Sequence, residues 1–289
     1  MREIHLAVFD LDNTLWDNFA ANEQAVSGLI HDLSRSSGVS LEAVALGMRQ
    51  VLEENDGKLF YYPGTIPHNR ALADAHPGVD LAARHAPEAE AFDQALLGLM
   101  TPYEGMREVL QELKARGIRL ACYSESPSTK ALGRLKALGL ADMFELICTS
   151  ANVKEKHRPE LPVGYAPADC GLAVLHRVVT NSDGPGPKTH PEILLRILAD
   201  LGVEPRHAAM IGDHPERDVA MAMKGGVLGI HAAWGEGSLK DLALTGEIHP
   251  YIRHVRQSAM QRGGVAADLV AESPKSLLRF LRGPGRKNP

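Results

Sequence analysis

The chain has 289 residues, of which 44% are hydrophobic and 23% are charged, and its formal net charge at pH 7 is −5. This balance is typical of a globular protein with one large domain or two smaller ones. The negative charge argues against a general nucleic-acid or membrane-surface binder, which needs a basic face. Small phosphorylated substrates are not excluded, because a bound metal ion can supply positive charge.

The chain has three cysteines, which is an odd number, and no two of them have the Cys-x-x-Cys spacing. We therefore expect no disulfide framework and no zinc site, and a reducing cytoplasm is the expected location. No apolar stretch approaches the roughly 18–20 residues of a membrane span. The first apolar run begins close to the N-terminus, which leaves no room for a signal peptide.

Short apolar runs alternate with helical segments along most of the chain. The runs predict buried strands at 4–9, 118–123, 144–148, 208–211, 227–230 and 268–271, and a further strand within 172–179. Helices are predicted at 104–116, 127–138, 191–201, 219–224 and 274–281. Strands that alternate with helices indicate an α/β fold with a Rossmann-like, doubly wound parallel sheet.

A helical insert interrupts this alternation after the first strand. Residues 18–100 are rich in Ala, Leu, Glu and Met, and no strand pattern is visible there. Ser40 is positioned to cap a helix over 41–52, and 86–100 is a second predicted helix. We thus expect an α/β domain from residues 1–17 and 101–289, with 18–100 as a separate helical domain. Residues 150–187 show no regular pattern and form an irregular insertion, and residues 283–289 are expected to be disordered.

Two carboxylates follow the first predicted strand, in the segment Asp10-Leu11-Asp12-Asn13-Thr14. If the chain stays extended, the side chains of Asp10 and Asp12 point to the same face at the carboxyl end of the strand, where open α/β sheets bind ligands. Two adjacent carboxylates repel each other, so the pair indicates a bound cation or a shared proton. A simple turn or helix cap is the structural alternative.

Polar residues also follow three later strands. Ser124 follows the strand 118–123 and could hold an anionic oxygen or cap a helix, and Glu125 beside it is a further substrate-binding candidate. Lys188, in the segment Pro187-Lys188-Thr189-His190-Pro191-Glu192, could neutralise charge in a phosphate site or be merely solvated. Asp213 and Asp218, in Gly212-Asp213-x4-Asp218, could complete an oxygen-ligand shell for Mg²⁺ or begin a capped helix.

The order of these motifs resembles that of the haloacid dehalogenase-like (HAD) hydrolase superfamily. The resemblance covers about residues 4–235 and the last strand–helix pair, and the first and fourth motifs carry most of it. It implies that the helical insert is a cap of the type placed between the first and second motifs. The dehalogenases of this superfamily lack the second aspartate of the first motif. The presence of Asp12 therefore favours the phosphatase branch, similar to phosphoglycolate phosphatases.

The resemblance also implies a role for each motif residue. Asp10 would be the nucleophile that carries a transient aspartyl-phosphate, and Asp12 would be the general acid and base. Mg²⁺ would be held by the Asp10 carboxylate, the Asp12 backbone carbonyl and Asp213, with Asp218 orienting that shell or Lys188. Three residues would position the phosphoryl group, namely Thr14, Ser124 and Lys188.

Two segments depart from the family pattern. The gap between Ser124 and Lys188 is longer than usual, so Lys154 or Lys156 is an alternative for the third-motif lysine. Residues 236–266 are also additional, and they contain a group of cationic side chains that either bind an anion or form a solvated helix face: His249, Arg253, His254 and Arg256. Within the cap and its hinge, five residues are candidate contacts for the leaving group: Trp16, Asn18, Tyr61, Tyr62 and His68.

The leading functional hypothesis is a Mg²⁺-dependent phosphatase for a small phosphorylated metabolite. A phosphomutase would use the same Asp10 and Asp12 chemistry but return the phosphoryl group to the sugar. A HAD-fold binding or regulatory protein without turnover is the alternative from another class. We expect no nucleic-acid or membrane partner, and the sequence does not determine the substrate or the oligomeric state.

Overall fold

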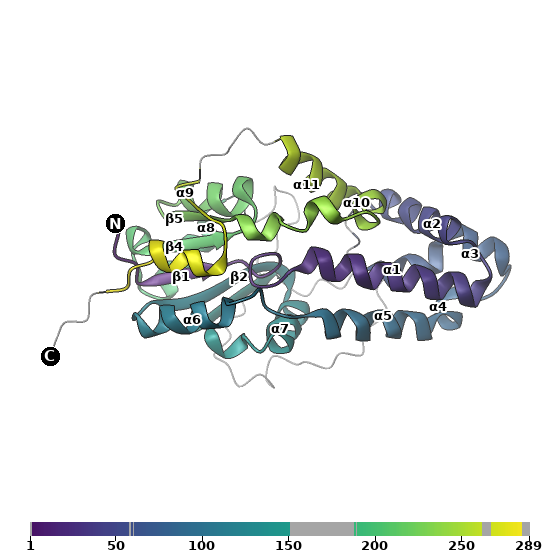
Figure 1. The fold of residues 1–289 in the computed structure, drawn as a ribbon, viewed down its shortest axis with the longest axis horizontal. Coiled ribbons are helices and arrows are strands. Elements are labelled where there is room, and N and C mark those ends of the chain that lie inside the picture. Colours follow the sequence, from purple (N-terminus) through teal and green to yellow (C-terminus); the bar gives the residue numbers. More distant parts are fainter. Residues whose placement is uncertain are drawn as a thin grey trace.

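The protein is described by a computed structural model that covers residues 2–57, 59, 61–150, 188, 190–261 and 267–284. Within these ranges, six strands form one parallel sheet in the order β3-β2-β1-β4-β5-β6 (Figure 1). The strands are β1 (Leu6–Phe9), β2 (Arg119–Pro127), β3 (Leu146–Ser150), β4 (Ala208–Gly212), β5 (Leu228–Ala232) and β6 (Leu269–Ala271). The order runs outward from β1 in both directions, so the predicted doubly wound α/β fold is confirmed.

Each strand predicted among these residues is present, although some boundaries differ. β2 runs further than predicted, to Pro127, because it continues along β3 through a register shift between Tyr123 and Pro127. The strand predicted within 172–179 lies outside the described residues, as do Lys154, Lys156 and all but the first residue of the insertion at 150–187. Residues 285–289 of the predicted disordered end lie outside them too.

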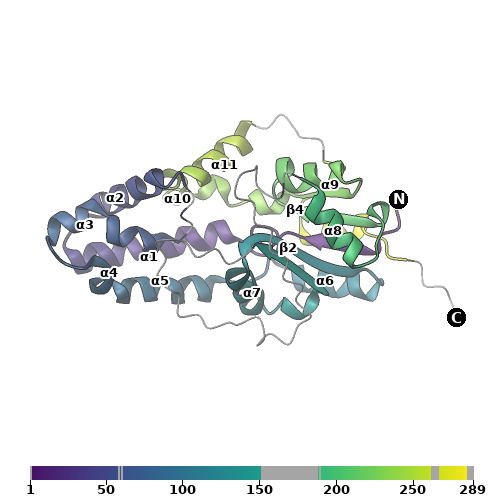
Figure 2. The ribbon, with the colours of Figure 1, turned by 180° about the vertical axis from the view of Figure 1, so that it is seen from behind.

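Helices cover both faces of the sheet because side chains alternate along each strand. Leu6 and Val8 pack in a buried cluster with α8 (Glu192–Asp200) and α9 (Ala220–Lys224). Ala7 and Phe9 pack on the opposite side, in a cluster with three other helices: α6 (Met106–Ala115), α7 (Ser128–Ala137) and α12 (Leu277–Phe280). Figure 2 shows α8 and α6 on opposite sides of the strands. The carboxyl edge of the sheet is therefore held between two packed layers.

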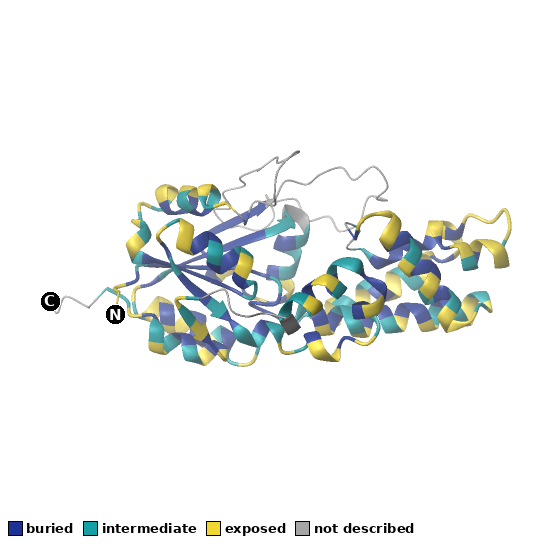
Figure 3. Ribbon diagram, turned by 90° about the horizontal axis from the view of Figure 1, so that it is seen from above, coloured by how far each residue is buried: buried dark blue, intermediate teal, exposed yellow. Residues whose placement is uncertain are grey.

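A layer of helices extends beyond one edge of the sheet (Figure 1). Its helices are α1 (Asn18–Ser37), α2 (Leu41–Glu54), α3 (Arg70–Ala75), α4 (Leu81–Arg84) and α5 (Ala86–Leu99). They share a buried cluster that includes Leu29, Met48 and Phe92, and Figure 3 shows buried residues along their inner faces. The predicted cap on α2 is confirmed, because the Ser40 side chain accepts a hydrogen bond from the Ala43 amide at 3.3 Å.

Two helices from late in the chain join this layer. They are α10 (Thr245–Ile248) and α11 (Pro250–Gln261). Ile248 belongs to the buried cluster of the helical layer. The carboxylate of Glu23 in α1 accepts hydrogen bonds from the Leu244 amide, the Thr245 amide and the Thr245 hydroxyl at 2.5–2.7 Å. Part of the chain that the sequence places with the α/β domain thus contacts the helical layer.

His249, between α10 and α11, is fully buried and makes stability depend on pH. Burial lowers its pKa from 6.5 to about 4, and the charge of Arg253 adds to this, against a hydrogen bond with the Leu59 carbonyl. The unfolded chain therefore binds a proton that the folded chain does not. This stability is fully present above about pH 6.5 and is lost as the pH falls toward 4.

We expect the free energy of unfolding to fall by about 2 kcal/mol between pH 7 and pH 5 because of His249. Urea unfolding at several pH values measures this, and the His249→Gln variant should show a flatter profile. His254 lies on α11 and is exposed, so His254→Gln is the matched control and should keep the wild-type profile. Equal profiles for wild type and His249→Gln would contradict the assignment.

Two of the three cysteines lie within the described residues. Cys122 and Cys148 are buried, and Cys170 lies outside the described residues. Among the helices of the described ranges, none combines the length and the apolar composition that crossing a bilayer requires.

Candidate active site

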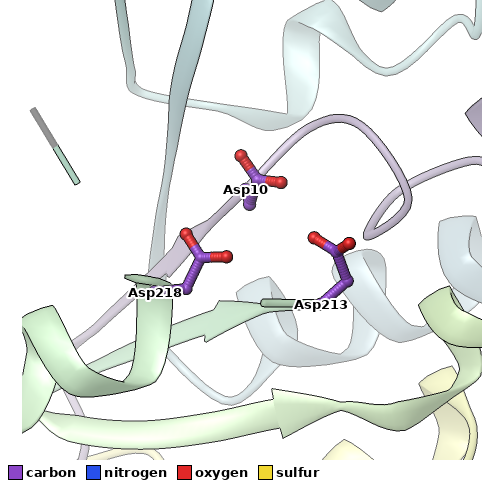
Figure 4. A group of neighbouring side chains, drawn as sticks. All are labelled: Asp10, Asp213 and Asp218. Atoms are coloured by element: carbon purple, nitrogen blue, oxygen red, sulfur yellow. The ribbon is translucent and has the colours of Figure 1, made fainter. Parts of the chain in front are cut away.

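Three aspartates meet at the carboxyl edge of the sheet. Asp10 follows β1 and Asp213 follows β4, which are neighbouring parallel strands, and the Asp10 amide donates to the Ile211 carbonyl at 2.9 Å. Asp218 comes from the π-helical turn Pro215–Val219. One oxygen from each of the three carboxylates lies within 4.8 Å of the others. Figure 4 shows the three carboxylates around a shared space.

Gly212 provides the room that Asp218 needs. A Cβ at residue 212 would lie 2.3 Å from Cγ of Asp218, well inside contact distance. The Asp218 carboxylate also accepts a hydrogen bond from the His214 amide at 3.2 Å, which fixes the turn around it. A glycine before Asp213 is therefore part of the geometry of the cluster.

Lys188 supplies positive charge to this cluster. Its side chain is buried, and its Nζ forms ion pairs with Asp10 and, at 2.7 Å, with Asp218. Burial alone would lower the pKa of Lys188, but the charges of Asp10 and Asp218 outweigh it and raise the pKa, so the lysine stays charged. The structure thus brings Lys188 to the carboxylates, while the alternatives Lys154 and Lys156 lie outside the described residues.

The cluster brings three carboxyl groups together with one cationic side chain. Burial raises the pKa of Asp10 to about 7, with Lys188 opposing and Asp218 adding to the shift. Burial and the charges of Asp10 and Asp218 also raise the pKa of Asp213 well above its ordinary value. Within the described part of the chain, Lys188 forms ion pairs with two of these three carboxylates, Asp10 and Asp218. Three converging carboxylates with one cation are an oxygen-ligand set that fits Mg²⁺.

Asp12 lines the same cleft but has hydrogen-bond partners of its own. Its Oδ1 accepts a hydrogen bond from Nε1 of Trp16 at 2.9 Å, and its Oδ2 accepts from the Ser126 hydroxyl at 3.0 Å and from Arg134. Asp10 and Asp12 nevertheless both line this one cleft. The chain leaves the extended conformation after Asp10, and Asn13 has a positive φ of 61°, which asparagine tolerates better than most residues.

The remaining motif residues hold the loops together. Thr14 is fully buried, and its hydroxyl accepts a hydrogen bond from the Asp213 amide at 3.1 Å. Ser124 is buried at the cleft, where its hydroxyl accepts from the Ser126 amide at 3.1 Å. Glu125 accepts a hydrogen bond from the Lys188 amide at 3.1 Å and pairs with Arg217. Glu125 therefore positions Lys188 through its backbone.

The cleft above the cluster has a volume of about 630 Å³. Residues from the sheet and its loops line one side of it, and residues from the helical layer line the other. Of the predicted leaving-group contacts, Asn18 and Tyr62 line it. The other three predictions are wrong: Trp16 is buried in the core, the Tyr61 hydroxyl donates to Asp93 at 3.0 Å, and His68 is exposed outside the lining.

Several cleft residues escaped the sequence reasoning. Arg134 comes from a segment with no motif signal, and Arg217 is one of the four unspecified residues between Asp213 and Asp218 in the fourth motif. Three more come from α11: Tyr251, Ile252 and Val255. A periodic apolar face over 248–255 was the available signal for α11.

The cationic residues of 236–266 do not gather at one anion site. Arg253 pairs with Glu53 at 3.3 Å, and Arg256 donates to the Leu242 carbonyl at 3.1 Å. His249 is buried rather than on a solvated face, and His254 is exposed. The four side chains therefore have different partners and different degrees of burial.

The fold and the site define an α/β protein with an acidic, lysine-containing pocket at the carboxyl edge of its sheet. A sequence profile described as "haloacid dehalogenase-like hydrolase" matches residues 4–226. The chain therefore belongs to the haloacid dehalogenase-like hydrolase family, and it is a hydrolase.

Named relatives and solved structures agree with this family. The chain is 27% identical over 167 residues to a phosphoglycolate phosphatase of Nitrosospira multiformis, covering 56% of this chain and 68% of that one. It is 27% identical over 241 residues to a phosphoserine phosphatase of Thermus thermophilus, covering 81% and 90%. A HAD-superfamily hydrolase of Geobacter sulfurreducens has the same fold, with a TM-score of 0.54, 19% identity and 97% of each chain covered.

Proposed function

We propose that this hydrolase is a Mg²⁺-dependent phosphatase that cleaves small phosphomonoesters through an aspartyl-phosphate on Asp10. The observation that supports it most is the contact of Lys188 with both Asp10 and Asp218, beside Asp213, in a cleft open to a small ligand. Relatives named as phosphatases, among them those of Nitrosospira multiformis and Thermus thermophilus, support the same reaction.

The proposed reaction has two steps. A carboxylate oxygen of Asp10 bonds to phosphorus as the bond to the leaving oxygen breaks, and Asp12 gives that oxygen a proton. Asp12 then takes a proton from the water that attacks the aspartyl-phosphate, which releases phosphate and restores Asp10. Lys188 offsets the negative charge of the phosphoryl group throughout. Ser124, which lines the cleft, is the proposed donor that positions a phosphoryl oxygen.

The residues present fit a magnesium ion. The carboxylates of Asp10 and Asp213 and the backbone carbonyl of Asp12 would hold it. Asp218 would orient these ligands and Lys188. When bound, Mg²⁺ supplies positive charge that stabilises the phosphoryl oxygens in the transition state. Thr14 positions Asp213 through the hydrogen bond to its amide, and we propose this role for Thr14 beside the predicted contact with the phosphoryl group.

We further propose that residues 18–100 act as a cap over the cleft, with 1–17 and 101–289 as the catalytic domain. Asn18, Phe19, Asn22 and Tyr62 line the cleft from this helical side. A cap of this kind excludes water from the reacting groups and selects the leaving group. α11 supplements the cap, because Ile252 and Val255 line the cleft as well.

Removal of the metal tests the proposed function directly. We expect hydrolysis of p-nitrophenyl phosphate to fall at least about 100-fold after chelation, and to return in a saturable way as Mg²⁺ is added, because charge stabilisation of this kind is worth several kcal/mol. Colorimetric release of p-nitrophenol measures both. The Asp213→Asn variant should need more Mg²⁺ for half-maximal activity, whereas Asp241→Asn, at an exposed site, should match the wild type. Full activity of the metal-free protein would contradict the proposal.

A further inference from the structure

Two adjacent residues of the turn after β4 hold Lys188 from two sides. The carboxylate of Asp218 pairs with the Lys188 Nζ at 2.7 Å. The side chain of Arg217 pairs with one carboxylate oxygen of Glu125, whose other oxygen accepts a hydrogen bond from the backbone amide of Lys188 at 3.1 Å. The lysine is therefore fixed at its side chain by Asp218 and at its backbone, through Glu125, by Arg217.

The pair formed by Arg217 and Glu125 is partly sheltered from water. The two side chains are 27% and 24% exposed, so water screens their attraction less than it screens a pair on the open surface. The turn that carries Arg217 is itself held by hydrogen bonds from the amides of Arg217 and Asp218 to the His214 carbonyl, at 3.1 and 2.8 Å. Both residues that fix Lys188 thus belong to one hydrogen-bonded turn.

A second contact of Arg217 leads away from the sheet, to α11. The Nη1 of Arg217 donates to the hydroxyl of Tyr251 at 3.4 Å. This distance is longer than that of an ordinary hydrogen bond, so a small approach of α11 would strengthen the contact. Tyr251 lines the cleft together with Ile252 and Val255 of the same helix. A ligand that packs against this helix would therefore also affect the contact between Tyr251 and Arg217.

α11 is anchored to the helical layer. Arg253 pairs with Glu53 of α2 at 3.3 Å. Ile252 packs in a buried cluster with Phe19 of α1. A shift of this layer relative to the sheet, such as a cap makes when it closes, would therefore move Tyr251 and, through it, the turn after β4.

We propose that Arg217 is a positioning residue for Lys188 and that the hydroxyl of Tyr251 holds Arg217 in place, so that the lysine is fully aligned only when α11 lies against the cleft. This inference rests on the proposed phosphatase function and adds to it a link between the helical layer and the reacting groups. A lysine that offsets charge on the phosphoryl group loses much of its effect when it is displaced by about 1 Å. The link therefore acts on kcat more than on KM.

Hydrolysis of p-nitrophenyl phosphate by Tyr251→Phe, which removes the hydroxyl and keeps the ring, tests this link. We expect kcat to fall by about fivefold, the value of one ordinary hydrogen bond, with KM within about twofold of the wild type. Arg217→Gln should lose at least about tenfold in kcat, because it breaks the contacts with both Tyr251 and Glu125.

Double variants separate the link from a general loosening of the structure. In the Arg217→Gln background, and likewise in Glu125→Ala, the Tyr251→Phe change should alter kcat by less than about twofold, because the chain of contacts is already broken. Near-ultraviolet circular dichroism checks that each variant is folded. The Glu125→Ala background carries the test if Arg217→Gln does not fold.

Tyr61→Phe is the matched control. Tyr61 lies on the helical side as well, and its hydroxyl donates a hydrogen bond to Asp93 at 3.0 Å, but it lies outside the cleft lining. Its kcat should equal that of the wild type. The inference is overturned if Tyr251→Phe keeps the wild-type kcat or changes KM alone, if its effect is as large in the double variants as in the wild type, or if Tyr61→Phe loses as much. A wild type that does not hydrolyse p-nitrophenyl phosphate in Mg²⁺ would instead contradict the proposed function itself.

Discussion

The Asp10→Asn variant is expected to lose at least about 10³-fold of its activity toward p-nitrophenyl phosphate, because loss of a nucleophile removes the covalent route. An amide is too weak a nucleophile to attack phosphorus. Asparagine has almost the same shape as aspartate, and Lys188 retains its ion pair with Asp218 at 2.7 Å. The fold should therefore persist, and near-ultraviolet circular dichroism with a thermal melt checks this in the same samples.

Asp241→Asn is the control for this experiment, since Asp241 is exposed and far in sequence from the motifs. It should keep wild-type activity and the wild-type melting temperature. A folded Asp10→Asn protein that hydrolyses p-nitrophenyl phosphate at the wild-type rate would contradict the assignment of Asp10 as nucleophile. Trapping of a phosphorylated protein in the wild type, but not in Asp10→Asn, would support it independently.

The Lys188→Met variant is expected to lose both activity and stability. Methionine has a similar length but no charge, so Asp10 and Asp218 would lose their buried ion-pair partner. Breaking a buried pair by removing one partner costs about 3–5 kcal/mol. Loss of the positive charge at the phosphoryl group should lower kcat by about 10²–10³. Urea unfolding in the presence of a chelator and steady-state kinetics in Mg²⁺ measure the two effects.

Added Mg²⁺ should recover more stability in Lys188→Met than in the wild type, because the cation binds only the folded cluster and relieves the repulsion among its carboxylates. Lys240→Met, at an exposed site, is the control and should be neutral in both measurements. A Lys188→Met protein as stable and as active as the wild type would place the functional lysine elsewhere in the chain.

The sequence predicted the sheet well because each strand is a short, largely apolar run. Asp10 and Asp213 were predicted for the same reason: the carboxyl ends of parallel strands meet at one edge. Lys188 was predicted from its place in the order of motifs, ahead of the helix that begins near Pro191. Helix positions followed from capping residues and glycines, as with Ser40 before α2 in the helical layer. These are local signals, and they do not require knowledge of the tertiary structure.

The surroundings of Asp12 could not be predicted in this way. Its contacts depend on a change of backbone direction at Asn13 and on Arg134, which lies 122 residues away in the sequence. The path of α11 was also beyond local reasoning, because its cleft-lining side chains are placed by packing against α1 and by the Glu23 contacts at the start of α10. Trp16 and Tyr61 were poor predictions because an aromatic residue signals burial rather than exposure to a ligand.

The central place of β1 in the sheet has a consequence for biosynthesis. β1 is made first, but its two neighbours are β2, more than 100 residues later, and β4, about 200 residues later. Contacts of such sequence separation form slowly, since a long stretch of chain must be ordered to make them. During synthesis, Asp10 therefore meets Lys188, Asp213 and Asp218 only after most of the chain has left the ribosome. The nascent chain thus carries the proposed nucleophile for most of its synthesis without the groups proposed to activate it.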